Sequence, residues 1–113
     1  MAYDEKLTRR LRDALSATQH ISERKMMGAV CFLYQGNMIG GADRQKSGQG
    51  RFLFRVGKDN APAALAQGNA TQMEQGGRTM RGFVFVSEQD CDDSDLGDWI
   101  EQAMSFVRTL PAR

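Results

Sequence analysis

The sequence predicts an α+β fold in which helices cover an antiparallel sheet, in the order α-β-β-β-α-β-β-α. Apolar residues recur with the period of a helix at both ends of the chain. Between these ends lie short apolar runs of strand character, separated by glycine-containing turns. With 41% hydrophobic and 26% charged residues among 113, the chain has the composition of an ordinary globular protein with one modest core.

The first helix is expected from about Asp4 to Gln19. Leu7, Leu11 and Leu15 recur at the spacing of one helical face, and most of the charged residues lie off that face. Asp4 is the expected N-cap, since its carboxylate accepts hydrogen bonds from free backbone N–H groups.

A stretch over residues 23–43 organises the sheet. Gly28 predicts a bend within one long strand that ends at Tyr34, because a glycine inside a strand permits a kink. Both faces of this strand are apolar beyond the bend, so we expect it in the interior of the sheet. Residues 35–37 form a turn, and residues 38–43 return beside the strand.

The next strand is expected over residues 51–56. Phe52 and Phe54 share one face with the core, while Arg51 and Arg55 lie on the other face. One side of this strand is therefore buried and the other is partly in contact with water.

A short helix over residues 60–67 precedes a second hairpin. Pro62 fits the first turn of this helix, where a missing N–H donor costs nothing. Strands over residues 72–75 and 82–86 are expected to pair, with Gly76-Gly77 in the tight turn between them.

The last helix is expected from about Asp93 to Thr109. Its apolar stripe includes Trp99, the only tryptophan, which we expect to be a core anchor. Acidic residues before and within its first turns favour capping of the helix over cation binding, because the spacing lacks the glycine and the distant glutamate of an EF-hand. These residues are Glu88, Asp90, Asp92, Asp93, Asp95 and Asp98.

The sequence predicts no cofactor and no metal site. Cys31 and Cys91 are expected to be free thiols, since the chain has no CxxC pair and His20 is its only histidine. The methionines of the organising stretch are expected to pack rather than to bind a soft metal: Met26, Met27 and Met38.

The N-terminal residues lack the apolar core of a secretory signal. No apolar run approaches the roughly 20 residues that span a bilayer. We therefore expect a cytoplasmic protein.

Two groups of motifs carry a family resemblance. The first is Arg24-Lys25-Met26-Met27-Gly28-Ala29, followed by Cys31-Phe32-Leu33 and Gly36-Asn37-Met38; the second is Gly77, Arg78, Met80, Gly82 and Phe83, with Trp99 and Leu110-Pro111 after it. Together they resemble the N-terminal domain of the TfoX/Sxy competence regulators, which also occurs alone in many short bacterial proteins. Met27 stands where the family usually has phenylalanine, and Ala29 where it has a second glycine.

The resemblance implies a single TfoX N-terminal-like domain over residues 1–113, with an α+β fold similar to that of secretion chaperones. It supplies no established catalytic residues. Full-length competence regulators carry a second, C-terminal domain that these 113 residues do not contain. The resemblance therefore concerns the role of the N-terminal domain alone.

Three classes of function are compatible with the sequence. The first is a non-enzymatic interaction or regulatory module with an unidentified protein partner, because no catalytic constellation is recognisable. The second is nucleic-acid binding, and the third is a small enzyme that uses Cys91, His20 or the acidic cluster. The distribution of charge argues against the uniformly basic surface of many nucleic-acid-binding proteins. Residues 26–86 carry a net charge of +4, but residues 87–113 carry a net charge of −5.

Basic side chains are the candidate residues for partner binding. Arg78 has a second interpretation, in which its guanidinium hydrogen-bonds backbone carbonyls and ties the second hairpin to the first. The candidate residues are Arg24, Lys25, Arg51, Arg55, Arg78 and Arg81, to which the nucleic-acid hypothesis adds Arg44 and Lys46.

We also expect self-association, most simply as a homodimer. Short helices cannot easily cover both faces and both edges of the sheet, so a sheet surface or a strand edge near residues 23–43 is expected to pair with a second copy. The alternative is a monomer in which the two terminal helices cover one face and long side chains shield the other.

Overall fold

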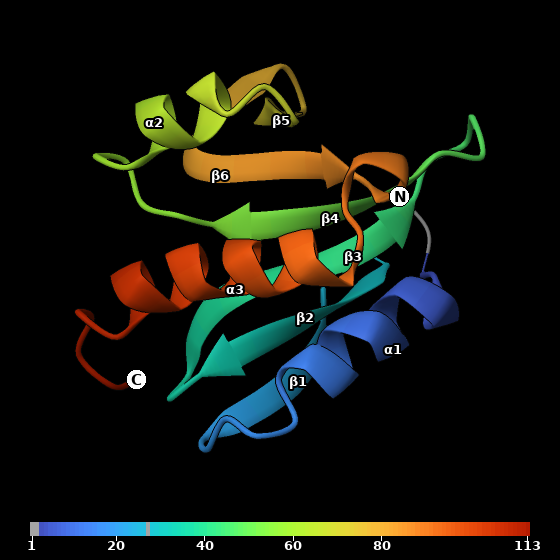
Figure 1. Ribbon diagram of the computed structural model, residues 1–113. Helices are drawn as coiled ribbons and strands as arrows, with labels where there is room; N and C mark the ends of the chain where they lie inside the picture. The colour runs from blue at the N-terminus through green and yellow to red at the C-terminus, as the bar shows by residue number, and fades with distance from the viewer. Residues whose placement is uncertain (1–2, 27) are drawn as a thin grey trace.

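The computed structural model describes residues 3–26 and 28–113 (Figure 1). In this part of the chain, helices and a six-stranded antiparallel sheet form an α+β fold, and the strand order is β1-β2-β3-β4-β6-β5. The elements are α1 (Glu5–Ala14), β1 (Ile21–Met26), β2 (Ala29–Tyr34), β3 (Asn37–Arg44), β4 (Gly50–Arg55), α2 (Ala61–Ala66), β5 (Ala70–Gln75), β6 (Arg78–Ser87), the short 3-10 helix η1 (Glu88–Asp90) and α3 (Asp93–Val107). The fold class is the predicted one, with one strand more than expected.

The extra strand is β1, and the prediction of one long strand bent at Gly28 was wrong. β1 pairs antiparallel with β2, so that Met26 lies opposite Ala29 and the chain reverses between them. Gly28 has a φ of +78°, which suits a tight hairpin turn better than a kink within a strand. Met27, for which packing was predicted, lies outside the described residues. β1 is polar because it lies at an edge of the sheet, where charged side chains are tolerated.

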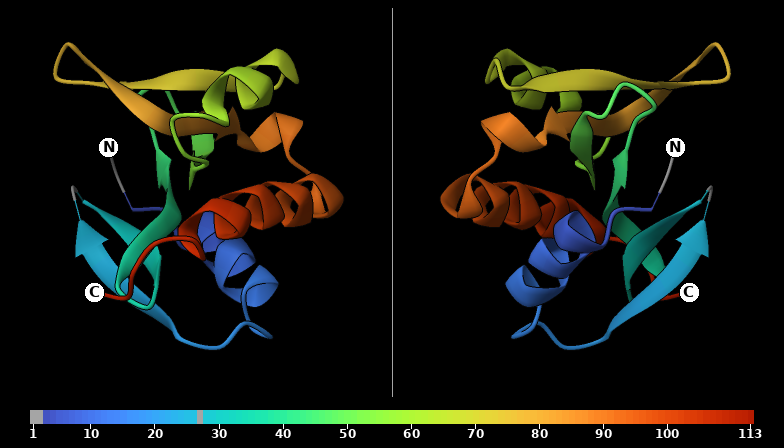
Figure 2. Two further views of the ribbon diagram at one scale, coloured as in Figure 1. Left: turned by 90° about the vertical axis from the view of Figure 1, so that its left-hand side faces the viewer. Right: turned by 90° about the vertical axis from the view of Figure 1, so that its right-hand side faces the viewer.

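The helices pack on one face of the sheet. α1 and α3 lie beside each other across the strands, and α2 covers β5 and β6 (Figure 1). The residues beneath them form the main core, in which the Trp99 ring stacks on Phe54 with 5.7 Å between ring centroids. The predicted role of Trp99 as a core anchor is confirmed. Figure 2 shows the β5–β6 hairpin extending away from α1 and α3.

The opposite face of the sheet carries a smaller apolar cluster and a buried ion pair. Leu53, Met73 and Phe85 form the cluster. Beside it, Arg51 Nε donates to Asp43 Oδ1 at 2.9 Å, and the guanidinium lies 3.6 Å from the centroid of the Phe85 ring. The side chains of Asp43 and Arg51 are only 3% and 17% exposed. This pair therefore belongs to the packed structure of the sheet.

α1 is shorter than predicted, because it ends at Ala14 rather than near Gln19. The N–H of Leu15 donates to the carbonyls of both Leu11 and Asp13, which tightens the last turn. The predicted N-cap is confirmed, since Asp4 accepts a hydrogen bond from the N–H of Leu7 at 2.9 Å.

Arg44 links the residue before α1 to η1, which follows β6. Its Nε donates to Asp4 Oδ2 at 2.7 Å, and its Nη1 donates to Glu88 Oε1 at 3.1 Å. Burial opposes the ionisation of Asp4, but the N–H of Leu7 and the charge of Arg44 outweigh it, so that the pKa of Asp4 lies below its usual 3.8.

This lowered pKa predicts a loss of stability in acid. The contribution of Asp4 is complete above its ordinary pKa of 3.8 and is lost as the pH falls from there through the lower folded value. Urea unfolding between pH 6 and pH 2.5 measures the effect. Asp4→Asn is the matched control, because asparagine also caps a helix but does not titrate. We expect a flatter pH dependence in this variant, and an identical slope in both proteins would contradict the assignment.

α3 begins as the acidic sequence predicted. Asp92 is its N-cap and forms a capping box with Asp95, which confirms the capping role of part of the acidic cluster. Beyond α3, the Asn37 side chain donates to the carbonyl of Pro111 at 2.8 Å, and the N–H of Arg113 donates to the carbonyl of Gln35 at 2.8 Å. The last residues are thereby held against the β2–β3 turn. None of the helices in the described residues is long and apolar enough to cross a membrane.

Candidate functional site

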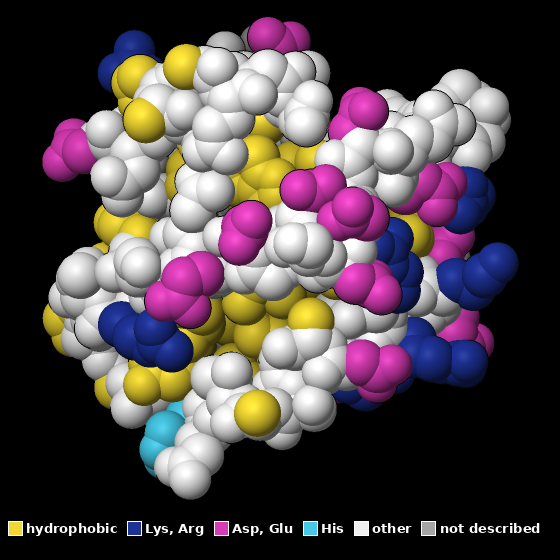
Figure 3. Space-filling view, in the orientation of Figure 1, with side chains coloured by type: hydrophobic (Ala, Val, Ile, Leu, Met, Phe, Trp, Pro, Cys, Tyr) yellow, Lys and Arg dark blue, Asp and Glu magenta, His cyan; other side chains and the backbone are white. Residues whose placement is uncertain are grey.

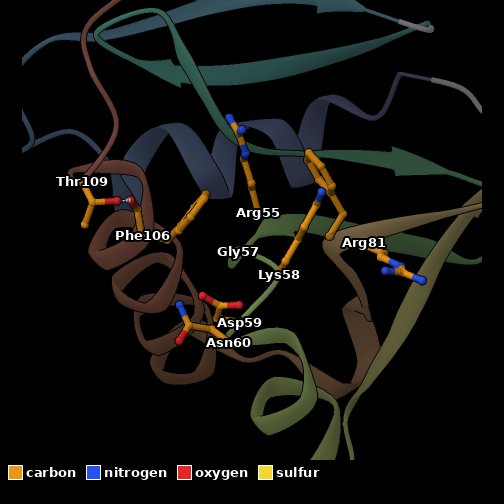
Figure 4. Close-up of a pocket in the computed structure, with 9 residues that line it drawn as sticks. Arg55, Gly57, Lys58, Asp59, Asn60, Arg81, Phe106 and Thr109 are labelled. Carbon is orange, nitrogen blue, oxygen red and sulfur yellow. Dashed lines mark hydrogen bonds between the residues drawn. The ribbon is translucent and has the colours of Figure 1, made fainter.

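A pocket of about 550 Å³ opens where β4 ends (Figure 4). Arg55 is the last residue of β4, and the chain then passes Gly57 to reach the turn before α2. β6 contributes one wall through Phe83, which lies opposite Arg55 in the sheet, and the end of α3 contributes Phe106. The lining residues are Arg55, Gly57, Lys58, Asp59, Asn60, Arg81, Phe83, Phe106 and Thr109.

Gly57 allows the aromatic wall to form. Its φ is +91°, and a Cβ atom there would lie 2.5 Å from the ring of Phe106. Only glycine fits both the left-handed backbone and this close approach. The turn after β4 therefore brings the ring of Phe106 directly against the backbone beside Arg55.

Arg55 is the central cation of the pocket. Its guanidinium is half-buried between the rings of Phe83 and Phe106, at 5.8 and 5.5 Å from their centroids. Burial lowers the pKa of Arg55, and the charge of Arg113 lowers it further. Among the described residues no carboxylate lies within ion-pair distance of Arg55. The fold thus holds a partly desolvated positive charge without a compensating negative one.

Two further cations line the pocket. Lys58 rises from the turn before α2, whereas Arg81 points away from Arg55 (Figure 4). Lys58 and Arg81 also line an adjoining hollow of about 480 Å³ beside α2. Among the described residues, Asp59 is the one carboxylate in either lining, so these residues give both hollows a net positive charge.

The polar groups opposite Arg55 are partly engaged by the fold. The Asn60 side-chain amide donates to the carbonyl of Val56 at 2.9 Å, and the Thr109 hydroxyl donates to the carbonyl of Phe106 at 2.6 Å. Their oxygen atoms remain available as acceptors, as do those of Asp59. The pocket can therefore hold an anion at Arg55 and accept hydrogen bonds from the rest of a ligand.

The residues considered for catalysis lie elsewhere. His20 is exposed after α1, with its ring edge-on to Tyr34 at 6.3 Å. Cys31 and Cys91 are free, as predicted, and both are buried. Burial raises the pKa of Cys91 to about 11, although Arg10 opposes the shift, and burial also raises that of Cys31. Thiols with raised pKa values are poor nucleophiles near neutral pH.

The structure separates the six candidate cations into groups. It brings Arg55 and Arg81 to the pocket and its adjoining hollow. Arg24 and Lys25 are exposed on β1 at the opposite side of the sheet. Arg51 is engaged by Asp43 and so contributes to the sheet.

Arg78 is exposed at the start of β6, next to the turn of the β5–β6 hairpin. The pairing of β6 with β4 begins only at Phe83, so this end of the hairpin is remote from the β2–β3 hairpin. The strand pairing does not place Arg78 beside the β2–β3 hairpin, and the tie between the two hairpins stays a prediction.

Sequence reasoning missed Lys58, Phe106 and Arg113 as neighbours of Arg55. One sequence feature could have identified Lys58 as a site residue: it follows Gly57, where a turn is expected at the end of a strand. Phe106 and Arg113 come from a different part of the chain, and only the packing of α3 and the attachment of the last residues bring them near.

Comparison with known proteins gives one match. A family model described as the TfoX N-terminal domain matches residues 13–107. No curated protein and no solved structure matches the chain. The matched range includes the motifs from Arg24 to Trp99 but not Leu110-Pro111, and it extends from the last residues of α1 to the end of α3. The chain therefore belongs to the TfoX N-terminal domain family.

Proposed function

We propose that this chain is a non-catalytic interaction module of the cytoplasm, with a regulatory role like that of the N-terminal domain of competence regulators. Its binding site is the basic pocket, and its partner is a protein that inserts an acidic segment there. The observation that carries the proposal is Arg55, a half-buried arginine without a carboxylate partner among the described residues.

The physical reason is the cost of such a charge. Partial burial of a cation is unfavourable unless an opposite charge or hydrogen-bond acceptors compensate for it. An incoming carboxylate would provide both, and charge-assisted hydrogen bonds are about twice as strong as neutral ones. Lys58 adds a second donor at the same opening. The pocket is thus better suited to an anion-bearing ligand than to an apolar one.

Nucleic-acid binding is the alternative that the distribution of charge disfavours. Acidic side chains follow the exposed face of α3, which adjoins the pocket (Figure 3). A long phosphate backbone would have to pass close to these carboxylates, whereas a short acidic segment would not.

The test uses a fluorescent peptide of alternating glutamate and glycine. We expect measurable binding that weakens as salt is added. Arg55→Gln should weaken it about tenfold, which corresponds to about 1.4 kcal/mol. The control is Arg9→Gln, which removes the same charge from an exposed position on α1 and leaves binding unchanged.

A thermal melt of Arg55→Gln accompanies the test. Arg55 forms no ion pair within the described residues, so the variant is expected to fold, with a Tm lowered only slightly by the loss of the contacts with Phe83 and Phe106. Equal binding by the two variants would remove the pocket from the proposal. Submicromolar binding of duplex DNA at physiological salt, without peptide binding, would favour the nucleic-acid alternative.

Self-association through the sheet stays a prediction. β1 occupies one edge of the sheet, and no described helix packs on the face that carries Leu53 and Phe85. Because Arg24 and Lys25 protect the β1 edge, we expect a dimer that dissociates on dilution. Light scattering across a concentration series measures it. A mass that remains at the 12.6 kDa of one chain at every concentration would exclude the dimer.

A further inference from the structure

The charge around Arg55 exceeds what one carboxylate compensates. Arg55, Lys58 and Arg81 line the pocket, and Asp59 is the only acidic side chain that the described part of the chain adds to that lining. Arg113 adds a further positive charge close enough to act on Arg55. A glutamate or aspartate of a partner brings a single negative charge, whereas a phosphate monoester carries nearly two at neutral pH. The balance of charge therefore favours the phosphate.

The geometry of Arg55 favours the same group. The rings of Phe83 and Phe106 lie 5.8 and 5.5 Å from the guanidinium carbon and limit its movement, and no carboxylate of the described residues forms an ion pair with it. A rigid guanidinium fork binds phosphate oxygens in a bidentate manner, and a phosphate has a further oxygen for a second cation. Lys58 lines the same pocket from the turn before α2 and is the candidate for that cation.

The size of the pocket indicates that the phosphate is attached to something larger. A volume of about 550 Å³ is in the range of pockets that take organic ligands and is too large for an inorganic ion alone. The remaining space is bounded by the two aromatic rings and by the acceptors of Asp59, Asn60 and Thr109. A short length of peptide offers matching N–H donors and aliphatic atoms.

We infer that the acidic group this pocket takes is the phosphate monoester of a phosphorylated side chain in a partner protein. The inference rests on the proposed function, since it specifies the acidic segment that the interaction module binds. It assigns bidentate contacts to Arg55 and a second oxygen to Lys58. Arg81 and Arg113 raise the positive potential around the site without a required contact.

The experiment compares three short peptides that differ only at their centre, with phosphoserine, glutamate or serine among glycine and alanine. Binding to the full chain is measured by calorimetry. We expect the phosphoserine peptide to bind about tenfold tighter than the glutamate peptide, and the serine peptide not to bind. Arg55→Gln and, separately, Lys58→Gln should each remove most of this advantage, whereas Arg9→Gln should keep it.

Each of the other outcomes contradicts either the phosphate inference alone or the proposed function as well. Equal affinity for the phosphoserine and glutamate peptides would contradict the inference and leave the proposed function intact. Absence of binding by both acidic peptides would contradict both. Free phosphoserine is the last probe: competition at the same concentration as the peptide would assign the pocket to small phosphorylated molecules instead of a protein. If Arg55→Gln does not fold, as judged by circular dichroism, Lys58→Gln decides the question, because Lys58 is exposed and its loss leaves the aromatic contacts in place.

Discussion

Asp43→Ala is expected to lower the free energy of unfolding by about 3 kcal/mol, because it leaves the cation of Arg51, whose side chain is only 17% exposed, without its partner. Arg51 donates from both Nε and Nη2 to the Asp43 carboxylate, at 2.9 and 3.3 Å. The stacked ring of Phe85 prevents the guanidinium from moving easily into water. Urea unfolding followed by circular dichroism measures the loss.

The double variant Asp43→Ala/Arg51→Met distinguishes the contribution of the ion pair to stability from the contribution of side-chain packing. Methionine keeps an apolar stem on Phe85 without a charge, so the double variant should be more stable than Asp43→Ala alone. Asp13→Ala, which removes an exposed carboxylate of α1, is expected to change stability by less than about 0.5 kcal/mol. If Asp43→Ala cost no more than this control, the pair would not be a structural element of the sheet.

Trp99→Ala is expected to lower the free energy of unfolding by about 3–5 kcal/mol, through lost burial and the cavity left behind. The side chain is 4% exposed and lies flat on Phe54, with 13° between the two ring planes. The indole thus joins α3 to the middle of the sheet, and its removal weakens both.

Trp99→Phe is the matched variant, since it retains an aromatic ring and part of the volume. We expect it to lose clearly less stability than Trp99→Ala. Because Trp99 is the only tryptophan, unfolding must be followed by circular dichroism rather than by fluorescence. Similar stability of the wild type and Trp99→Ala would contradict the role of α3 as the main cover of the sheet.

Local patterns predicted most of the fold. The alternation of Phe52 and Phe54 with the arginines of β4 marked a strand with one core face, and the stripe containing Trp99 marked the helix that covers it. Burial of one face of a strand or helix leaves a periodic apolar pattern in its sequence. This pattern can be recognised in each segment without knowledge of the others. β1 was missed because an edge strand buries few side chains. Its charged residues therefore show no periodic apolar pattern.

The candidate site was predicted only as a set of basic residues. The sequence identified Arg55 and Arg81, but it gave Arg51 equal weight. Arg51 and Arg55 have the same local pattern, and they differ only in their neighbours across the sheet. Asp43 lies beside Arg51 and neutralises it, whereas Phe83 lies beside Arg55 and does not. Pairing between distant segments decides this difference, and no local pattern carries it.

The most direct test of binding at the pocket is a titration of the isotope-labelled protein with the acidic peptide, followed by two-dimensional NMR. If the pocket is the binding site, the largest shifts will come from the backbone amides of Arg55, Lys58, Phe83 and Phe106, which line it. The amides of Arg24 and Lys25 on β1 will move little in that case. Shifts concentrated on β1, with the pocket amides unchanged, would contradict the assignment of this pocket as the site through which the chain binds its partner.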